Sequence, residues 1–318
     1  MVVFVLAIAA WATPSSPSAT FSPPVEDPTL VEPGWAARPV RHTPAHAAAD
    51  LVVTLDQQLY PAAVPALAQL AAARGVRIDV ERGTCGVSAG ALFRKEAEIA
   101  GFCCPPGPDD RLPGVRYRTL GVAAIAVIVH PDNPVRELTL ADARALFEGR
   151  IRRWSDLSGG AGFARPVVPV VRLHCKRRPG HWHLLLDNED LFSPRAVEVG
   201  AIEDMVAQVG RRPGAVGWET AWMARHRAPA GRPVRMVRVD GVDPLDTEAL
   251  AAGRYPLYRT FTLATWAADD NPLVVAAVAA VERAFTATAD TFVAVGSATL
   301  VRHGWRFAGG ELQGALAR

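Results

Sequence analysis

Residues 120–135 read LGVAAIAVIVHPDNPV, and this stretch decides the fold class. Its apolar run from Gly121 to Val129 is continuous, which is typical of a strand buried on both faces of a sheet. Two prolines then force a turn. After the turn, Thr139 is placed to cap a helix that begins at Leu140, and Gly149 is placed to end it. The stretch therefore predicts a buried strand followed by a helix, the unit from which α/β proteins are built.

The same alternation of elements continues on both sides of this stretch. Alternating or continuous apolar runs predict further strands, at 51–55, 76–80, 167–173, 215–218, 234–239 and 255–264. Apolar residues at helical spacing predict helices, at 60–73, 91–97, 272–285 and 291–299, with two short helical stretches within 193–209. This order predicts an α/β fold with mostly parallel strands flanked by helices.

Composition limits the possible functions. The chain has 318 residues, with 34 Lys and Arg against 32 Asp and Glu, for a formal net charge of +2. This small charge argues against a general nucleic-acid partner, which requires a strongly basic surface. The length suits about two domains. No run reaches the 18 apolar residues of a transmembrane helix, so a soluble mature chain is expected.

The amino-terminal region predicts export. Residues 1–12 read MVVFVLAIAAWA, an apolar run that ends in a small-x-small pattern, and we interpret them as a signal peptide. Residues 13–49 are rich in proline, which suits an extended linker, so the folded body is expected to begin near Asp50. The predicted location is the periplasm.

Several motifs together resemble one known family. Residues 120–135 and 138–140, the segment LFEGRIRRWSDL at 146–157, and the later segments 213–218, 239–244 and 253–259 occur in the order and spacing of the phosphate-binding-protein (PstS-like) family of periplasmic ABC-transporter solute receptors. The resemblance implies a type II periplasmic-binding-protein fold with two lobes joined by two crossing strands. Lobe one is expected at 50–122 and 256–307, and lobe two at 123–255.

The resemblance also implies a function. Such a protein binds a small anion, phosphate or a related oxyanion, in the cleft between its lobes, and works with an ABC permease or a membrane sensor. It is expected to be a monomer without cofactor and without catalytic activity. The family's ligand loops fall on four segments of this chain, and the candidate ligand-binding residues are Thr54, Gln57, Cys85, Gly86, Ser88, Cys103, Cys104, Arg172, His174, Cys175, Gly180 and His181. Arg172 matches the family's arginine in lobe two, and its planar fork suits an oxyanion.

These loops depart from the family pattern. The usual Ser/Asp pair of the third loop is replaced by Cys103-Cys104, and the Ser-Gly-Thr motif is missing near Gly180 and His181. All four cysteines of the chain lie in three of the four loops. Two interpretations follow from this clustering. One is a disulfide bond between Cys85 and either Cys103 or Cys104, with the other of these two bonded to Cys175.

The other interpretation is a site for a soft metal or a metalloid. Thiolate and imidazole ligands suit Cu(I), Zn or arsenite, and the candidate ligands are Cys85, Cys103, Cys104, Cys175, His174 and His181. A cysteine-dependent enzyme is the least favoured alternative, because no hydrolase motif surrounds a Cys-His-Asp set that could include Asp56.

Overall fold

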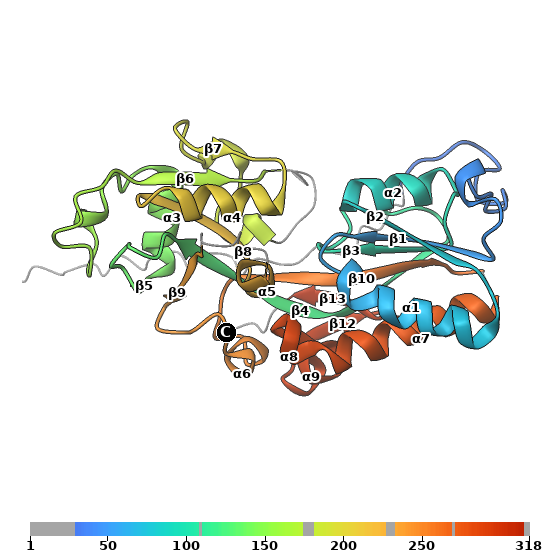
Figure 1. The fold of residues 1–318 in the computed structure, drawn as a ribbon. Coiled ribbons are helices and arrows are strands. Elements are labelled where there is room, and N and C mark those ends of the chain that lie inside the picture. Colours follow the sequence, from blue (N-terminus) through green and yellow to red (C-terminus); the bar gives the residue numbers. More distant parts are fainter. Residues whose placement is uncertain (1–28, 108–109, 174–180, 227–232, 269–270, 315–318) are drawn as a thin grey trace, which may run out of the picture.

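The computed structural model describes residues 29–107, 110–173, 181–226, 233–268 and 271–314. They form two α/β lobes joined by long strands (Figure 1). The predicted signal peptide, residues 1–12, lies outside the described residues. None of the helices in the described ranges is long and apolar enough to cross a membrane.

The described elements alternate along most of the chain. The strands are β1 (Leu51–Asp56), β2 (Ile78–Gly83), β3 (Ile99–Phe102), β4 (Val115–Val129), β5 (Glu137–Leu138), β6 (Val168–Val171), β7 (Val197–Glu198), β8 (Ala215–Thr220), β9 (Arg235–Val239), β10 (Tyr258–Trp266), β11 (Ala294–Gly296), β12 (Arg306–Ala308) and β13 (Glu311–Gly314). The helices are η1 (Pro44–His46), α1 (Tyr60–Arg74), α2 (Cys85–Phe93), α3 (Leu140–Glu148), η3 (Trp154–Asp156), η4 (His181–Leu184), η5 (Glu189–Leu191), α4 (Ile202–Arg211), α5 (Ala221–His226), α6 (Thr247–Ala251), α7 (Pro272–Ala287), α8 (Ala289–Phe292) and α9 (Ser297–Arg302).

Residues 120–129 form the second part of β4, the longest of the described strands. The half of β4 within 115–124 pairs with β10, and the half within 125–129 pairs with β8 and β9. The capping prediction for α3 is confirmed, since Thr139 forms a capping box with Asp142 and Gly149 ends the helix with φ +76°. A single strand therefore serves both lobes, and its second half is apolar throughout because it is buried on both faces.

Lobe one is the lobe built on β1–β3. Its strands lie in the parallel order β2-β1-β3, and β3 pairs antiparallel with β10. Helix α2 packs on this sheet, and α1 packs against α7 (Figure 1). The core is aliphatic and aromatic, and its largest fully buried members are Leu51, Leu55, Leu59, Leu67, Leu92, Ile99 and Phe102.

Lobe two is the lobe built on β6–β8. Strand β6 pairs in parallel with both β7 and β8, and β8 pairs antiparallel with β4. Helix α4 packs on β8 and β6 (Figure 1). Trp154 and Trp182 are fully buried in its core, and Tyr255 donates a hydrogen bond to the Ile125 carbonyl across 2.8 Å. These two tryptophans are therefore core residues, and Trp154 Nε1 donates a hydrogen bond to the Gly214 carbonyl.

Three helix predictions were partly wrong. The helix predicted at 91–97 is α2, which begins at Cys85 after the N-cap Thr84 and ends at Phe93. The other two lie beside short strands. Residues 291–299 contain the end of α8, the short strand β11 and the start of α9, because Val293 adopts a left-handed conformation with φ +50° and β11 then pairs with β4. Within 193–209 the structure has one strand, β7, and one helix, α4. In both places pairing with a neighbouring strand outweighs local helical spacing.

Part of the predicted linker packs on lobe one. Trp35 is buried, and its indole donates a hydrogen bond to the Phe93 carbonyl. Lys95 Nζ donates to the carbonyls of Ala36 and Arg38, and it lies over the rings of Trp35 and Trp266. Residues 29–41 therefore form a strap held against lobe one. The lobe and linker boundaries drawn from the sequence stay predictions.

Candidate functional site

The candidate site lies where strand ends of both lobes meet. Asp56 is the last residue of β1, and Cys103 directly follows β3. In lobe two, Arg172 directly follows β6, and Glu219 lies one residue before the end of β8. Ligand sites of α/β proteins form outside the carboxyl ends of parallel strands, because the loops there are free to carry polar groups. Because β1 pairs in parallel with β3, and β6 with β8, each lobe has an edge at which the carboxyl ends of parallel strands lie together.

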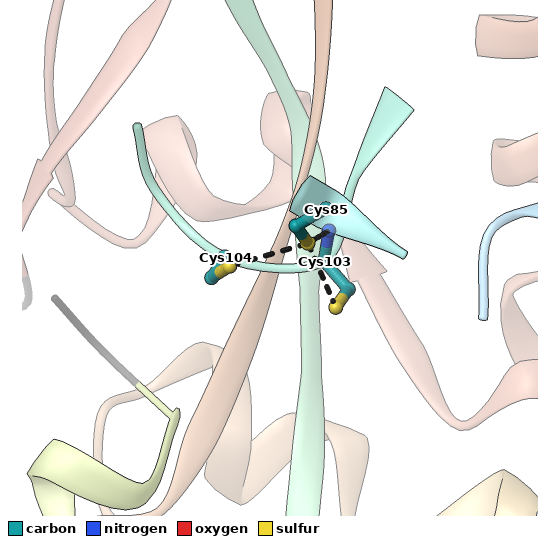
Figure 2. Close-up of side chains that lie close together, drawn as sticks. All are labelled: Cys85, Cys103 and Cys104. Atoms are coloured by element: carbon teal, nitrogen blue, oxygen red, sulfur yellow. Dashed lines mark hydrogen bonds between the residues drawn. The ribbon is translucent and has the colours of Figure 1, made fainter. Parts of the chain in front are cut away.

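Three cysteine sulfurs form a cluster on the lobe-one side. Cys85 is the first residue of α2, after the N-cap Thr84, whose side chain accepts a hydrogen bond from the Val87 N–H. The Cys85 Sγ lies 3.3 Å from the Cys103 Sγ and 3.3 Å from the Cys104 Sγ, and Figure 2 shows it between the two. All three sulfurs lie within 4.8 Å of one another. Their residues are 1%, 4% and 0% exposed, so bulk water is excluded from the cluster.

These distances correct one of the two interpretations of the cysteines. A disulfide bond has its sulfurs about 2.05 Å apart. The 3.3 Å separations are non-bonded contacts, so Cys85 is not joined to Cys103 or Cys104. The physical reason lies in the local geometry, since the Cys103 backbone N–H also donates to the Cys85 Sγ across 3.3 Å, which packs that sulfur against the main chain. Cys175, the fourth cysteine, lies outside the described residues.

A buried cation and a buried acid border the sulfurs. The Arg259 guanidinium, near the start of β10, lies 2.7 Å from the Cys103 Sγ, and the Asp56 carboxylate lies 3.7 Å from the Cys85 Sγ. Burial raises the pKa of Asp56 well above its ordinary range, and the charge of Cys103 raises it further. Burial by itself lowers the pKa of Arg259, but the negative charges of Cys103, Glu219 and Asp56 outweigh it and hold that pKa above its ordinary range. Arg259 therefore carries a permanent positive charge inside the site.

A second charged pair lies in lobe two and is bonded to a residue of lobe one. The Arg172 guanidinium donates to Glu219 Oε2 across 2.9 Å, and Gln58 Nε2 donates to Glu219 Oε1 across 3.1 Å. Gln58 lies just after β1 in lobe one, so its bond to Glu219 crosses from one lobe to the other. Glu219 is fully buried and also accepts from the Thr220 N–H. Such an acid is stable in the interior only because each carboxylate oxygen has a donor.

The structure places the predicted site residues as follows. Cys85, Cys103 and Cys104 come together, and Arg172 lies with Glu219. The hydroxyls of Thr54 and Ser88 lie 3.4 Å apart and link β1 to α2. The remaining six predicted residues fall into two groups, three that are described and three that are not. Gly86 lies in the first turn of α2, Gln57 is half-buried with its N–H bonded to the Gly83 carbonyl, and buried His181 opens η4, which packs against β10. His174, Cys175 and Gly180 lie outside the described residues, and the ligand roles of the whole set stay predictions.

Four polar residues of this site were not among the predicted ligands: Asp56, Gln58, Glu219 and Arg259. One signal could have found three of them. Asp56 and Glu219 each end an apolar run at a predicted strand, and Arg259 interrupts the apolar run at 255–264. A charged residue inside a strand buried on both faces requires a partner, which indicates a site. Gln58 carries no such signal.

Comparison with known proteins places this geometry in a family. Residues 42–272 match the family described as PBP superfamily domain. The chain belongs to the PBP superfamily. No curated protein matches this PBP superfamily chain in sequence.

Solved structures share its fold. A protein described as a phosphate ABC transporter substrate-binding protein from Clostridium perfringens, solved with bound phosphate, has a TM-score of 0.64 and 16% identity, over 76% of this chain and 97% of that one. An ABC-type phosphate transport receptor from Vibrio cholerae has a TM-score of 0.58 and 16% identity, over 81% of this chain and 100% of that one.

The regulatory domain of a LysR family regulator from N. meningitidis has a TM-score of 0.52 and 13% identity, over 77% of this chain and 97% of that one. At these identities the likeness concerns the fold alone. It confirms the predicted two-lobed α/β periplasmic-binding-protein fold of this PBP superfamily chain.

Proposed function

We propose that this protein is an extracytoplasmic solute-binding protein that binds a small oxyanion or oxyacid between its lobes, for ABC transport or for sensing. The observation that carries the proposal is a pair of buried polar atoms at the junction of the lobes. Arg259 Nε and Gln58 Oε1 have no hydrogen-bond partner among the described residues, although both are buried. Buried polar atoms in native proteins are almost always bonded, so this pair at the junction supports a ligand that would bond both atoms.

The surrounding groups suit a ligand that carries oxygen atoms. Arg259 and Arg172 bring two guanidinium groups, and Asp56 and Glu219 bring two carboxyl groups. Guanidinium donors bind oxyanions, and a carboxylate accepts a hydrogen bond from a ligand hydroxyl. The set is close to neutral, so it favours a partly protonated oxyacid over a highly charged anion.

Calorimetric titration of the purified full chain with phosphate, sulfate, arsenate and arsenite tests the proposal. We expect heat of binding with at least one of them and a smaller radius of gyration by X-ray scattering, since the lobes close on the ligand. Arg172→Met is expected to weaken this binding at least 30-fold, and Arg172→Lys less. The matched control Arg118→Met, an arginine 61% exposed, should bind as the native chain does. Absence of heat and of compaction with all four solutes would overturn the proposal.

Export is the second part of the proposal. It rests on the apolar segment at residues 1–12 and on the family resemblance, which places the partner, a permease or a sensor, at the membrane. Amino-terminal sequencing of the protein recovered from outside the cytoplasm tests it. Export predicts a mature chain that begins at Thr13, and recovery of an unprocessed cytoplasmic chain would contradict it. Light scattering of that same sample should give the mass of a monomer.

A further inference from the structure

We propose that the ligand of this site is a trivalent, thiol-binding oxyacid of the arsenite class, held by the sulfurs of Cys85, Cys103 and Cys104. This inference rests on the proposed function, because it names the ligand of the same receptor. Three observations carry it: the convergence of the three sulfurs, their spacing, and their burial beside the cation Arg259.

The convergence of the sulfurs comes from two segments of lobe one. Cys85 begins α2, and the adjacent Cys103 and Cys104 follow β3, so the parallel strands β1–β3 bring distant residues to one place. All three Sγ atoms lie within 4.8 Å of one another, so one central atom can contact all of them. Thiolates are soft ligands, and they favour soft metals and heavy p-block elements over the hard oxygen surface of phosphate.

The two sulfur separations that involve Cys85 favour a pyramidal centre, and the third, between Cys103 and Cys104, is within 4.8 Å. A tetrahedral zinc site with Zn–S bonds of about 2.3 Å holds its sulfurs ~3.8 Å apart. Cys85 Sγ lies closer than this to both other sulfurs, at 3.3 Å. With bonds of about 2.3 Å, that distance corresponds to an angle of roughly 90° at the central atom. A trivalent p-block centre carries a lone pair and bonds its three ligands at angles close to a right angle.

Burial adds a constraint on charge. A trivalent centre with three thiolates is neutral, whereas a monovalent metal with the same ligands carries two negative charges, one more than the neighbouring Arg259 can balance. The three cysteines are at most 4% exposed, and an unbalanced charge in such a place is costly. The binding step is a condensation: one trivalent oxyacid with three hydroxyl groups reacts with three thiols, three element–sulfur bonds replace three element–oxygen bonds, and three water molecules leave. No electron is transferred.

Arg259 has a role in this step. Its guanidinium lies 2.7 Å from the Cys103 Sγ, and a neighbouring cation favours a thiolate, which is the nucleophilic form of cysteine. We therefore expect Cys103 to form the first bond, while Cys85 and Cys104 complete the set. Arg259 acts as a positioning residue for Cys103, since its own atoms gain no bond to the central element.

Mass spectrometry under native conditions tests the inference. The reduced full chain and its Cys175→Ser variant are incubated with sodium arsenite, the variant having only the three clustered cysteines. We expect both to gain one arsenic atom with the loss of three hydrogens. The Cys175→Ser chain is also made with Cys85→Ser, Cys103→Ser or Cys104→Ser. Each of these double variants should form either no adduct or one in which arsenic keeps a hydroxyl, and should bind arsenite at least 100-fold more weakly. Cys175→Ser with Gly200→Ala is the matched control, expected to keep the three-sulfur adduct.

The outcomes separate this inference from the proposed function. Phosphate or sulfate binding with lobe closure, but without a three-sulfur arsenic adduct, would overturn the inference and leave the receptor proposal intact. Tighter binding of Zn²⁺ or Cu(I) than of arsenite by the Cys175→Ser variant would also overturn it. The adduct together with a smaller radius of gyration would support both, whereas an adduct without compaction would support the thiol site and count against the receptor.

Discussion

The guanidinium of Arg259 lies 2.7 Å from the sulfur of Cys103, and both residues are buried. This contact joins β10, which passes between the lobes, to the loop after β3 in lobe one. It also places a permanent positive charge beside three thiols and Asp56. A buried charge without a counter-charge destabilises a protein by several kcal/mol, so the acid and the sulfur hold Arg259 in place as much as Arg259 holds them.

Replacement of this cation should therefore affect folding. Arg259→Met is expected to lower the free energy of unfolding by about 3 kcal/mol, because it leaves Asp56 and Cys103 without their cation. Arg259→Lys keeps the charge and should cost less than half as much. Urea denaturation at pH 7 followed by tryptophan fluorescence measures both. Equal losses for the two variants would show that packing, and not charge, makes the contact important.

The buried ion pair of Arg172 and Glu219 is expected to contribute strongly to the stability of lobe two. Glu219→Gln should cost about 3 kcal/mol, because Arg172 loses the acid that neutralises it in the interior. The double variant Arg172→Met with Glu219→Gln should lose less than the sum of the single variants, as expected for residues in direct contact. Urea denaturation of the four proteins gives this double-mutant cycle. The exposed pair Arg94 and Glu96 is the control, and Glu96→Gln should change stability by less than about 0.5 kcal/mol.

Lys95 is expected to hold the strap at 29–41 against lobe one. Its Nζ donates to two strap carbonyls, 2.8 Å and 2.6 Å away, and lies 4.5 Å from the centre of the Trp266 ring. Lys95→Met keeps the aliphatic stem but loses these contacts, so we expect about 2 kcal/mol of destabilisation and faster proteolysis within the strap. Limited trypsin digestion with mass mapping measures the second effect. Cleavage first elsewhere in the Lys95→Met chain would contradict this account of the strap.

Asp79 is expected to account for part of the loss of stability of the folded protein at acid pH. Hydrogen bonds from Arg77, and then from His46, lower its pKa to about 2. Because the folded-state pKa lies below the ordinary value, the stabilisation is complete above about pH 5 and is lost as the pH falls towards 2. Native protein should exceed Asp79→Asn in stability by up to about 1 kcal/mol at pH 6 and by only a small part of that near pH 2. Thermal denaturation across this range measures the difference, and a pH-independent difference would contradict the ion pair.

The position of Gly121 in β4 is expected to tolerate no side chain. A Cβ at this position would lie 2.1 Å from the Val295 carbonyl oxygen and 2.8 Å from the Phe285 ring, because β11 pairs closely with β4 there. Gly121→Ala should therefore cost about 2 kcal/mol or more. Gly200→Ala is the matched control, since no atom lies within 4 Å of its added Cβ. Melting temperatures of the two variants decide the point, and similar values would show that β11 is readily displaced.

The sequence by itself determined the α/β class, the buried strand at 121–129, the capped helix at 140–148 and the concentration of cysteines in candidate ligand loops. These features follow from local rules, since burial on both faces demands a continuous apolar run, and capping depends on residues only three apart. Local rules did not predict short elements such as β11, because a three-residue strand exists only through its pairing with β4.

Only the tertiary structure decided which residues meet. Strand order brings Cys85 against Cys103 and Cys104 without a disulfide bond, and it brings Arg259, from the far end of the chain, to the same sulfur. It also pairs Arg172 with Glu219 and links Glu219 to Gln58 of the other lobe. These contacts join residues far apart in the chain, and each depends on the packing of whole strands. No local spacing encodes them, and the chemistry of the site follows from them.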